Sequence, residues 1–288
     1  MKKSLFPLIG ILFSVSLALA QTPVEKFIRL SDSLTLGYVE QGSPTGTPVI
    51  LLHGYTDSRH SYDQVLPHLP RTIHAYALSL RGHGNSSRPK TGYHPDDMAD
   101  DVIAFMDKAG IRTACMVGHS MGGSVVQSLA VRYPKRVQAF VLISSFVHFN
   151  LDGIHELSKL VANLNDPIDP AFGREFQQGT LHRPVPKDFF KTAIAETAKL
   201  PAHVWKGALN GQSQSRYIEK LSGVRQPTLI LWGDKDSYVP REHQMQFQNA
   251  IQGSKLLIYQ GTGHALHWEE PERFARDLVQ FIETIKPE

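Results

Sequence analysis

One serine, Ser120, has the sequence context of a catalytic nucleophile. It is the central residue of a Gly-x-Ser-x-Gly pattern over residues 118–122, between an apolar run and a helical pattern. In a tight turn from a strand into a helix, a serine adopts strained backbone angles, and its neighbours must be small. The hydroxyl then projects from the end of the strand, with the positive end of the helix behind it. The pattern predicts covalent chemistry at Ser120; a chance turn is the alternative.

A serine hydroxyl is a poor nucleophile at neutral pH, so it needs a base and an acid that orients the base. The chain has 14 histidines. His264 lies in a loop after the last apolar run and is a candidate base, with His267 as its rival. Asp234 and Asp236 follow the apolar run 228–232 and are the candidate acids.

These side chains need a scaffold that brings distant parts of the chain together. Short apolar runs without alternation are typical of strands buried on both faces, as in a parallel sheet. Helical patterns lie between them, which predicts an α/β fold with a doubly wound, mainly parallel sheet. Residues 27–30 and 34–40 alternate in polarity and predict an antiparallel hairpin. The predicted strands are 49–52, 73–80, 114–117, 137–143, 228–232 and 255–259, and the predicted helices are 96–109, 122–133 and 271–285.

Residues 146–223 break this rhythm. The segment shows no convincing strand, several prolines and helical patches such as 189–200. We therefore expect a helical cap inserted into a core of residues 21–145 and 224–288. The candidate pocket residues of this cap, which could equally pack its helices together, are Phe146, His148, Phe149, Phe172, Phe176, Trp205 and Leu209.

Together with the Ser120 pattern, four stretches make the chain resemble the α/β-hydrolase superfamily over nearly its whole length. They are residues 53–55, 81–86, 233–240 and 263–264, and each follows a predicted strand. The resemblance implies that His264 is the base and Asp236 is the acid of a Ser-Asp-His triad. It leaves Asp234 to accept hydrogen bonds from loop N–H groups, which Asp does readily in turns.

A tetrahedral intermediate also needs hydrogen-bond donors for its negatively charged oxygen. The backbone N–H of Met121, directly after the nucleophile, is one expected donor. The resemblance implies that the N–H of Tyr55 is the other, which leaves the Tyr55 side chain free to line the pocket. We also assign His53, His119, His148, Phe149 and Trp205 to the pocket, although a histidine in the position of His53 more often braces its loop. The sequence has no metal-ligand motif, so neither a metal nor another cofactor is expected.

The glycine-rich stretch 81–86 could suggest phosphate binding. It lacks both the dinucleotide-binding spacing and a following helix, so we interpret it as a structural turn. Ser79 departs from the family, which often has an acidic residue two positions before Arg81. This departure puts the local loop conformation in doubt and leaves the triad unaffected.

Composition sets the remaining limits. With 288 residues, 41% hydrophobic and 20% charged, the chain has the profile of a folded protein. Its formal net charge is +3, and no basic stripe suggests a nucleic acid partner. Cys115 is the only cysteine, which excludes an intramolecular disulfide, and its apolar surroundings predict a buried thiol.

Residues 1–20 have the pattern of a signal peptide. Lys2 and Lys3 precede an apolar stretch over residues 5–19, and small residues precede Gln21. We predict cleavage before Gln21 and export to a bacterial periplasm or medium, with no stable membrane anchor afterwards. An uncleaved anchor is the alternative, although the stretch is short for about 30 Å of hydrocarbon.

These observations favour an exported serine hydrolase that cleaves a small-molecule carboxylic ester or lactone through an acyl-enzyme on Ser120. Activity should fall in acid as the base becomes protonated. Haloalkane dehalogenases and epoxide hydrolases have Asp at the nucleophile position and are excluded. A cofactor-free perhydrolase or haloperoxidase and a C–C bond hydrolase have the same triad and stay open. A binding protein that retained the fold without the chemistry is the non-enzymatic alternative.

Overall fold

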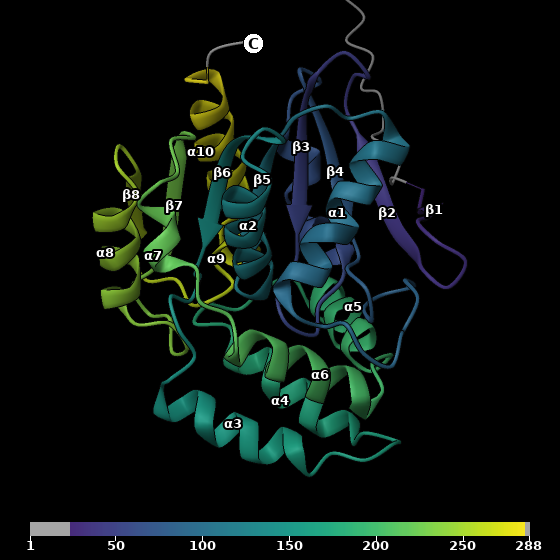
Figure 1. Ribbon diagram of the computed structural model, residues 1–288. Helices are drawn as coiled ribbons and strands as arrows, with labels where there is room; N and C mark the ends of the chain where they lie inside the picture. Colours follow the sequence, from purple (N-terminus) through teal and green to yellow (C-terminus); the bar gives the residue numbers. More distant parts are fainter. Residues whose placement is uncertain (1–23, 286–288) are drawn as a thin grey trace, which may run out of the picture.

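The computed structural model describes residues 24–285, and an eight-stranded sheet forms its centre (Figure 1). The strand order is β1-β2-β4-β3-β5-β6-β7-β8. β1 and β2 pair antiparallel with each other, β2 pairs antiparallel with β4, and every other pairing is parallel. The strands are β1 Lys26–Arg29, β2 Thr35–Gln41, β3 Thr47–Leu52, β4 Ile73–Leu78, β5 Ala114–His119, β6 Val137–Ile143, β7 Thr228–Gly233 and β8 Lys255–Tyr259.

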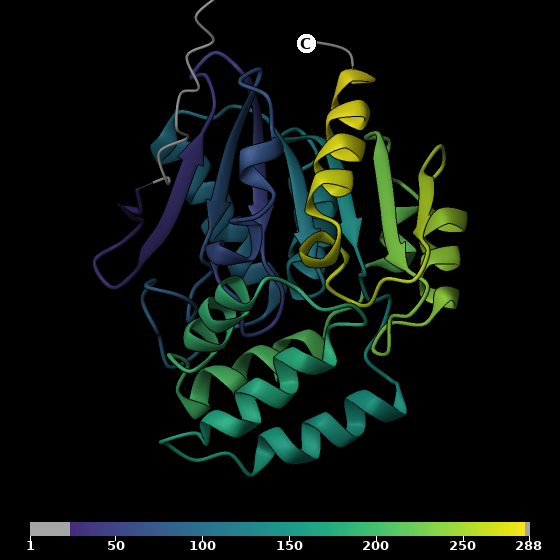
Figure 2. The same cartoon turned by 180° about the vertical axis from the view of Figure 1, so that it is seen from behind.

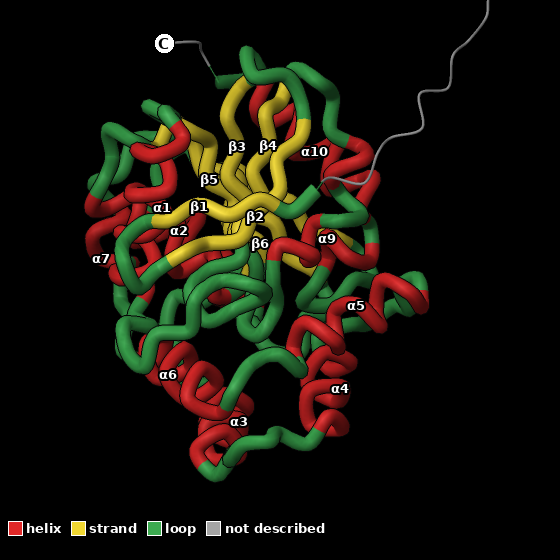
Figure 3. Tube along the Cα trace, turned by 90° about the vertical axis from the view of Figure 1, so that its right-hand side faces the viewer, coloured by secondary structure: helices red, strands yellow, loops and turns green. Residues whose placement is uncertain are grey.

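Helices cover both faces of this sheet (Figures 1 and 2). The helices α1 (Pro95–Ala109), α2 (Met121–Arg132) and α8 (Arg241–Ala250) lie on one face. The short helix α9 (Leu266–Glu269) and the last helix α10 (Pro271–Glu283) lie on the other, as the edge-on view also shows (Figure 3). Two short 3-10 helices, η1 (Arg59–Tyr62) and η2 (Leu66–His68), follow β3.

Successive side chains of the central strands enter two separate apolar cores. In β3, Ile50 and Leu52 pack with α1 and α2, whereas Val49 and Leu51 pack with the 3-10 helices and α10. Because side chains alternate between the faces of a strand and both faces are covered, these strands carry continuous apolar runs. The predicted fold class is thus confirmed, and so is the antiparallel hairpin formed by β1 and β2. Cys115 in β5 is fully buried, and burial raises the pKa of its thiol to about 12.

Helix α8 has no counterpart among the predicted helices, for a physical reason. The face that α8 buries includes His243 and Gln244 beside Phe247, so an apolar stripe of helical period is absent. His243 Nδ1 accepts a hydrogen bond from the Val147 N–H, and the Gln244 amide donates to the Ser145 carbonyl. Polar contacts from α8 therefore hold residues 145–147, which follow β6.

The predicted cap segment contains helices and no strand. Four of them lie across the carboxyl ends of the strands (Figures 1 and 2): α3 Asp152–Ala162, α4 Pro170–Gly179, α5 Lys187–Thr197 and α6 Ala202–Ser213. A fifth, α7 (Ile218–Leu221), packs against α2 and α8 instead, so the last part of the segment 146–223 lies beside the core.

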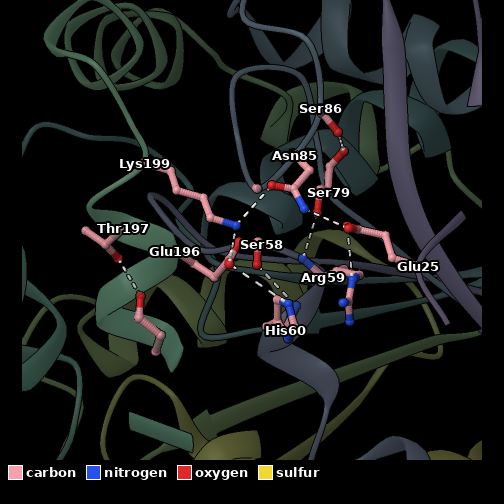
Figure 4. Close-up of polar contacts among 12 residues, drawn as sticks. Glu25, Ser58, Arg59, His60, Ser79, Asn85, Ser86, Glu196, Thr197 and Lys199 are labelled. Carbon is pink, nitrogen blue, oxygen red and sulfur yellow. Dashed lines mark hydrogen bonds and ion pairs between the residues drawn. The ribbon is translucent and has the colours of Figure 1, made fainter. Parts of the chain in front are cut away.

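A polar network joins the cap to the loops that follow β3 and β4 (Figure 4). Lys199, just after α5, donates to Asn85 at 3.0 Å and to Glu196 at 2.6 Å. The Asn85 amide donates in turn to Glu25, which also pairs with Arg59. These contacts hold the end of α5 on the core.

Ser79 takes part in the same region. Its hydroxyl accepts a hydrogen bond from the Arg59 N–H, and its carbonyl accepts one from the Ser86 hydroxyl (Figure 4). The loop is therefore ordered through a hydroxyl where the family often has a carboxylate. Arg81 instead pairs with Asp101 in α1 and donates to the Gly92 carbonyl, which agrees with a structural turn over residues 81–86.

The predicted signal peptide lies outside the described residues. Within residues 24–285, the structure has no helix that is both long and apolar enough to span a membrane.

Candidate active site

Ser120 occupies a strained turn between β5 and α2. Its backbone has φ 51° and ψ −111°, a conformation that non-glycine residues rarely adopt. A Cβ atom on Gly118 would lie 2.3 Å from the Gly122 carbonyl oxygen, and one on Gly122 would lie 2.4 Å from the Leu52 carbonyl oxygen. Both glycines are therefore required by close backbone approach. Ser120 is the N-cap residue of α2, yet its hydroxyl makes no capping hydrogen bond, so it stays available for chemistry.

His264 and Asp236 form a buried pair beside this serine. Nδ1 of His264 lies 3.1 Å from Oδ1 and 2.9 Å from Oδ2 of Asp236, whose side chain is fully buried. Since the carboxylate accepts, Nδ1 carries the proton and Nε2 is left with its lone pair. The N–H groups of Tyr238 and Val239 also donate to Oδ1, each at 2.9 Å, and these bonds fix the acid in place.

Ser120 and His264 line the same cavity, although no hydrogen bond joins them among the described residues. Hydrogen bonds between a nucleophile and its base are often long without substrate and tighten when it binds.

Asp234 and His267, the alternative acid and base in the sequence, make other contacts. Oδ1 of Asp234 accepts a hydrogen bond from the Gly261 N–H at 2.5 Å, which is the loop role expected for it. His267 is fully buried, and its Nε2 lies 3.0 Å from the Ser61 hydroxyl. Burial lowers the pKa of His267 to about 3, so this ring is neutral. His267 also does not line the cavity that Ser120 and His264 share.

Two backbone amides are available for a developing oxyanion. Within the described part of the chain, neither the N–H of Tyr55 nor that of Met121 donates a hydrogen bond. Both residues are buried and line the same cavity as Ser120. Because buried N–H groups are nearly always paired, two free ones beside a nucleophile indicate a site for a negatively charged oxygen.

The cavity over Ser120 is mostly apolar. The cap provides most of its wall, and the loop after β7 adds Tyr238. Its lining residues are Tyr55, Ser120, Met121, Phe146, Phe149, Ile154, Leu157, Phe176, Leu209, Gln212, Tyr238 and His264. Five of them agree with the sequence: Tyr55 and Phe149 are predicted pocket residues, and Phe146, Phe176 and Leu209 are candidates from the cap.

Four predicted pocket residues, His53, His119, His148 and Trp205, do not line this cavity, and neither does the cap candidate Phe172. His53 is fully buried; its Nδ1 donates to the Gly54 carbonyl, and its Nε2 accepts from the Leu80 N–H. It therefore braces the loop. Trp205 lies behind the wall, 5.4 Å from the Tyr55 ring between ring centroids. His148 packs on His243, with 4.4 Å between ring centroids.

His119 faces a second, smaller space of about 230 Å³, which Ser120 and His264 also line. Its Nε2 lies 3.1 Å from the His264 carbonyl oxygen, so Nε2 carries the proton. Burial lowers the pKa of His119 well below its ordinary value, and the ring is neutral. This hydrogen bond supports the loop that carries His264.

Asp57, which sequence reasoning missed, lines the same smaller space. Its Oδ1 accepts a hydrogen bond from the Gln177 amide of α4 at 2.8 Å, and its Oδ2 lies 3.8 Å from Nδ1 of His119. Burial raises the pKa of the Asp57 carboxyl to about 7. Its position two residues after Tyr55 was the available signal, but only the fold shows that it lines the same space as Ser120 and His264.

Comparisons with known proteins identify the family of the chain. The family model described as "alpha/beta hydrolase fold" matches residues 47–271, and the chain belongs to this family. A bifunctional esterase/perhydrolase of Acinetobacter calcoaceticus is 29% identical over 279 residues, which span 90% of this chain and 99% of the relative. A pimeloyl-[acyl-carrier protein] methyl ester esterase of Neisseria meningitidis is 26% identical over 248 residues, covering 83% of this chain and 78% of the relative.

Solved structures show the same fold. An esterase from Exiguobacterium antarcticum superposes with a TM-score of 0.79 at 21% identity and covers 91% of this chain and 100% of its own. A bromoperoxidase from Bacillus anthracis superposes with a TM-score of 0.80 at 24% identity and covers 90% of this chain and 100% of its own. The chain is thus an α/β-hydrolase, and the relatives support hydrolase activity on small molecules.

Proposed function

We propose that the protein is a serine hydrolase that cleaves carboxylic esters or lactones through an acyl-enzyme on Ser120. One observation carries this proposal: the hydroxyl of a strained turn shares an apolar cavity with a histidine that a buried carboxylate orients. Two unpaired amides at the same cavity complete the set of groups that acyl transfer requires.

In the first half of the reaction, Nε2 of His264 takes the proton of the Ser120 hydroxyl as its oxygen attacks the substrate carbonyl. The carbonyl oxygen becomes negative and accepts hydrogen bonds from the N–H groups of Tyr55 and Met121, each worth about 3 kcal/mol in comparable enzymes. His264 then protonates the leaving alcohol as the carbon–oxygen bond breaks. Asp236 stabilises the imidazolium that forms between these two steps.

In the second half, His264 removes a proton from water, and the resulting hydroxide attacks the acyl-enzyme carbonyl. The same two amides hold the second intermediate. Its collapse breaks the bond to Ser120, which recovers its proton from His264, and releases the acid. In a lactone, the leaving alcohol and the acid belong to one molecule, so the product is a hydroxy acid.

The test is hydrolysis of p-nitrophenyl acetate, butyrate and octanoate by the wild type and by Ser120→Ala. The proposal predicts turnover that disappears in the folded Ser120→Ala variant. Equal turnover by the two proteins would contradict it. Absence of turnover by a folded wild type on these esters and on a lactone panel would also contradict it, and would favour the binding-protein alternative.

Perhydrolysis is a second candidate, because a curated relative is named a bifunctional esterase/perhydrolase. Hydrogen peroxide would take the place of water in the second half and release a peracid. Peroxide-dependent bromide oxidation in acetate buffer, lost in Ser120→Ala, would support this activity. Its absence beside intact esterase activity would exclude it.

Export also belongs to the proposal. The first twenty residues have the charge and apolar pattern of a signal peptide. A bacterial host that expresses the full chain should yield a periplasmic or secreted protein whose first residue is Gln21. A cytoplasmic product that retains Met1 would contradict this expectation.

A further inference from the structure

Gln212 is the one lining residue of the apolar cavity with a side-chain amide. It lies on α6, its exposed fraction is 1%, and the other lining side chains from the cap, such as Leu209 and Phe176, are apolar. Among the described residues, neither its Nε2 nor its Oε1 has a hydrogen-bond partner. A buried amide with both ends unpaired costs about 1–3 kcal/mol for each group, which a structure rarely tolerates without a use.

The helix that carries Gln212 is held firmly against the core. The Tyr55 hydroxyl donates to the Trp205 carbonyl at 2.7 Å and ties the first turn of α6 to the loop with the oxyanion amide. Gly207 and Gly211 bring the helix onto Tyr93, where a Cβ on Gly211 would lie 2.3 Å from a carbonyl oxygen. Leu209 and Gln212 lie three residues apart on α6, so they share one side of the helix, and both line the cavity. The backbone that carries the Gln212 amide is therefore held in place.

The cavity also limits what this amide can bind. No Lys, Arg, Asp or Glu is among its lining residues, so neither an anion nor a cation would find a counter-charge there. The amide has two N–H donors and one carbonyl oxygen that accepts. A neutral hydroxyl can accept from one of these N–H groups and donate to the carbonyl oxygen with a single oxygen atom.

We propose that Gln212 is a specificity-determining residue that binds a hydroxyl group of the substrate, separated from the reacting carbonyl by an apolar chain. This inference rests on the proposed function, since the chain would lie between Ser120 and Gln212 along Met121, Leu209 and their apolar neighbours. The substrate class is an ester or lactone with a remote hydroxyl group. A site built for a hydroxyl discriminates strongly against an analogue that lacks it, because its own polar groups then stay unpaired.

The test compares matched esters that differ only in their last atom. One series has p-nitrophenyl acyl chains of four to ten carbons ending in a methyl or a hydroxyl group, and a second series carries the same ends on the alcohol side of acetate esters. In at least one of the two series, and at one chain length, the wild type should prefer the hydroxyl ester to the matched methyl ester by about 10- to 100-fold in kcat/KM. Gln212→Leu and Gln212→Met should reverse that preference by accelerating the methyl esters and slowing the hydroxyl ester.

Gln214→Leu is the matched control, because Gln214 lies at the end of the same helix with an exposed side chain. It should keep the wild-type ratio. A wild type that prefers the methyl ester at every length in both series overturns the inference, as does a folded Gln212→Leu protein with an unchanged ratio. Since either result requires turnover that depends on Ser120, each differs from a failure of the proposed function, in which no ester is hydrolysed.

Discussion

The chemistry assigned to Ser120 depends on side chains that never touch the substrate. Asp236 is buried, accepts two backbone N–H groups and faces Nδ1 of His264. These contacts hold the Asp236 carboxylate in position, and the carboxylate determines which nitrogen of His264 carries the proton. The proposed reactivity of Ser120 therefore depends on Asp236, which acts through His264 and does not contact the substrate.

Replacing Asp236 tests this dependence. In Asp236→Asn, the amide can donate to Nδ1 and favour the wrong tautomer of His264, so kcat should fall by about 10³- to 10⁴-fold, as in other Ser-His-Asp enzymes. Initial rates on p-nitrophenyl butyrate measure the effect. Asp234→Asn is the control: an Asn oxygen can still accept from the Gly261 N–H, and near-normal kcat is expected. A large loss in Asp234→Asn with little in Asp236→Asn would reverse the two assignments.

Asp57 predicts a pH dependence of stability. Burial raises its pKa from 3.8 to about 7, so the folded protein holds a proton that the unfolded chain releases across this range. Stability from this group is therefore full below about pH 4 and is lost as the pH rises to about 7. Asp57→Asn cannot titrate and lacks this loss.

Urea unfolding of both proteins between pH 4 and 8 provides the measurement. The free energy of unfolding of the wild type minus that of Asp57→Asn should fall with rising pH, by up to about 1.4 kcal/mol for each unit of the shift. Asp188→Asn, at an exposed carboxyl of α5, serves as a comparison. A difference between wild type and Asp57→Asn that stays constant over the whole range would show that Asp57 is ionised normally.

At the scale of elements, the decisive feature is the close packing of the β5–α2 turn against the end of β3. The N–H of Gly122 donates to the His53 carbonyl, and the N–H of Ser120 donates to the Ile143 carbonyl in β6. Three neighbouring strands thus converge on the nucleophile and hold its unusual backbone angles. This convergence explains why the turn admits no side chain at Gly122.

Gly122→Ala should therefore disturb both the fold and the reaction. Its Cβ would lie 2.4 Å and 2.7 Å from the carbonyl oxygens of Leu52 and His53, so the backbone must move. We expect a loss of about 2 kcal/mol or more in the free energy of unfolding and a large drop in kcat. Gly153→Ala in α3, where no atom lies within 4 Å of the added Cβ, should instead gain about 0.5–1 kcal/mol. Wild-type stability in Gly122→Ala would contradict this packing.

The elements themselves were largely predictable, because the signal lies in local apolar patterns. The strands and the helices α1, α2 and α10 bury apolar faces, and their periodicity is visible in the sequence. Helix α8 was not predictable from such a pattern, because its buried face includes His243 and Gln244. Short helices such as α9 and η1 lack the length for a periodic pattern.

At the scale of the whole molecule, the sequence indicated which polar residues come together far better than which residues line the pocket. Ser120, His264 and Asp236 follow strand ends, and a parallel sheet brings such ends to one edge. The cavity wall depends instead on how the cap helices dock. Trp205 and Gln212 share one face of α6, yet only Gln212 reaches the cavity while Trp205 packs behind Tyr55. No local pattern distinguishes the two.

The central claim is that this fold activates Ser120 as a nucleophile, and covalent labelling tests it most directly. An alkyl fluorophosphonate forms a stable tetrahedral adduct with an activated serine, and mass spectrometry of the intact protein and its peptides locates the adduct. We predict one equivalent on Ser120 of the wild type and of Ser222→Ala, an exposed serine far along the chain, and none on Ser120→Ala. A folded wild type that stays unlabelled, or a Ser120→Ala protein that is labelled as fully, would contradict the account.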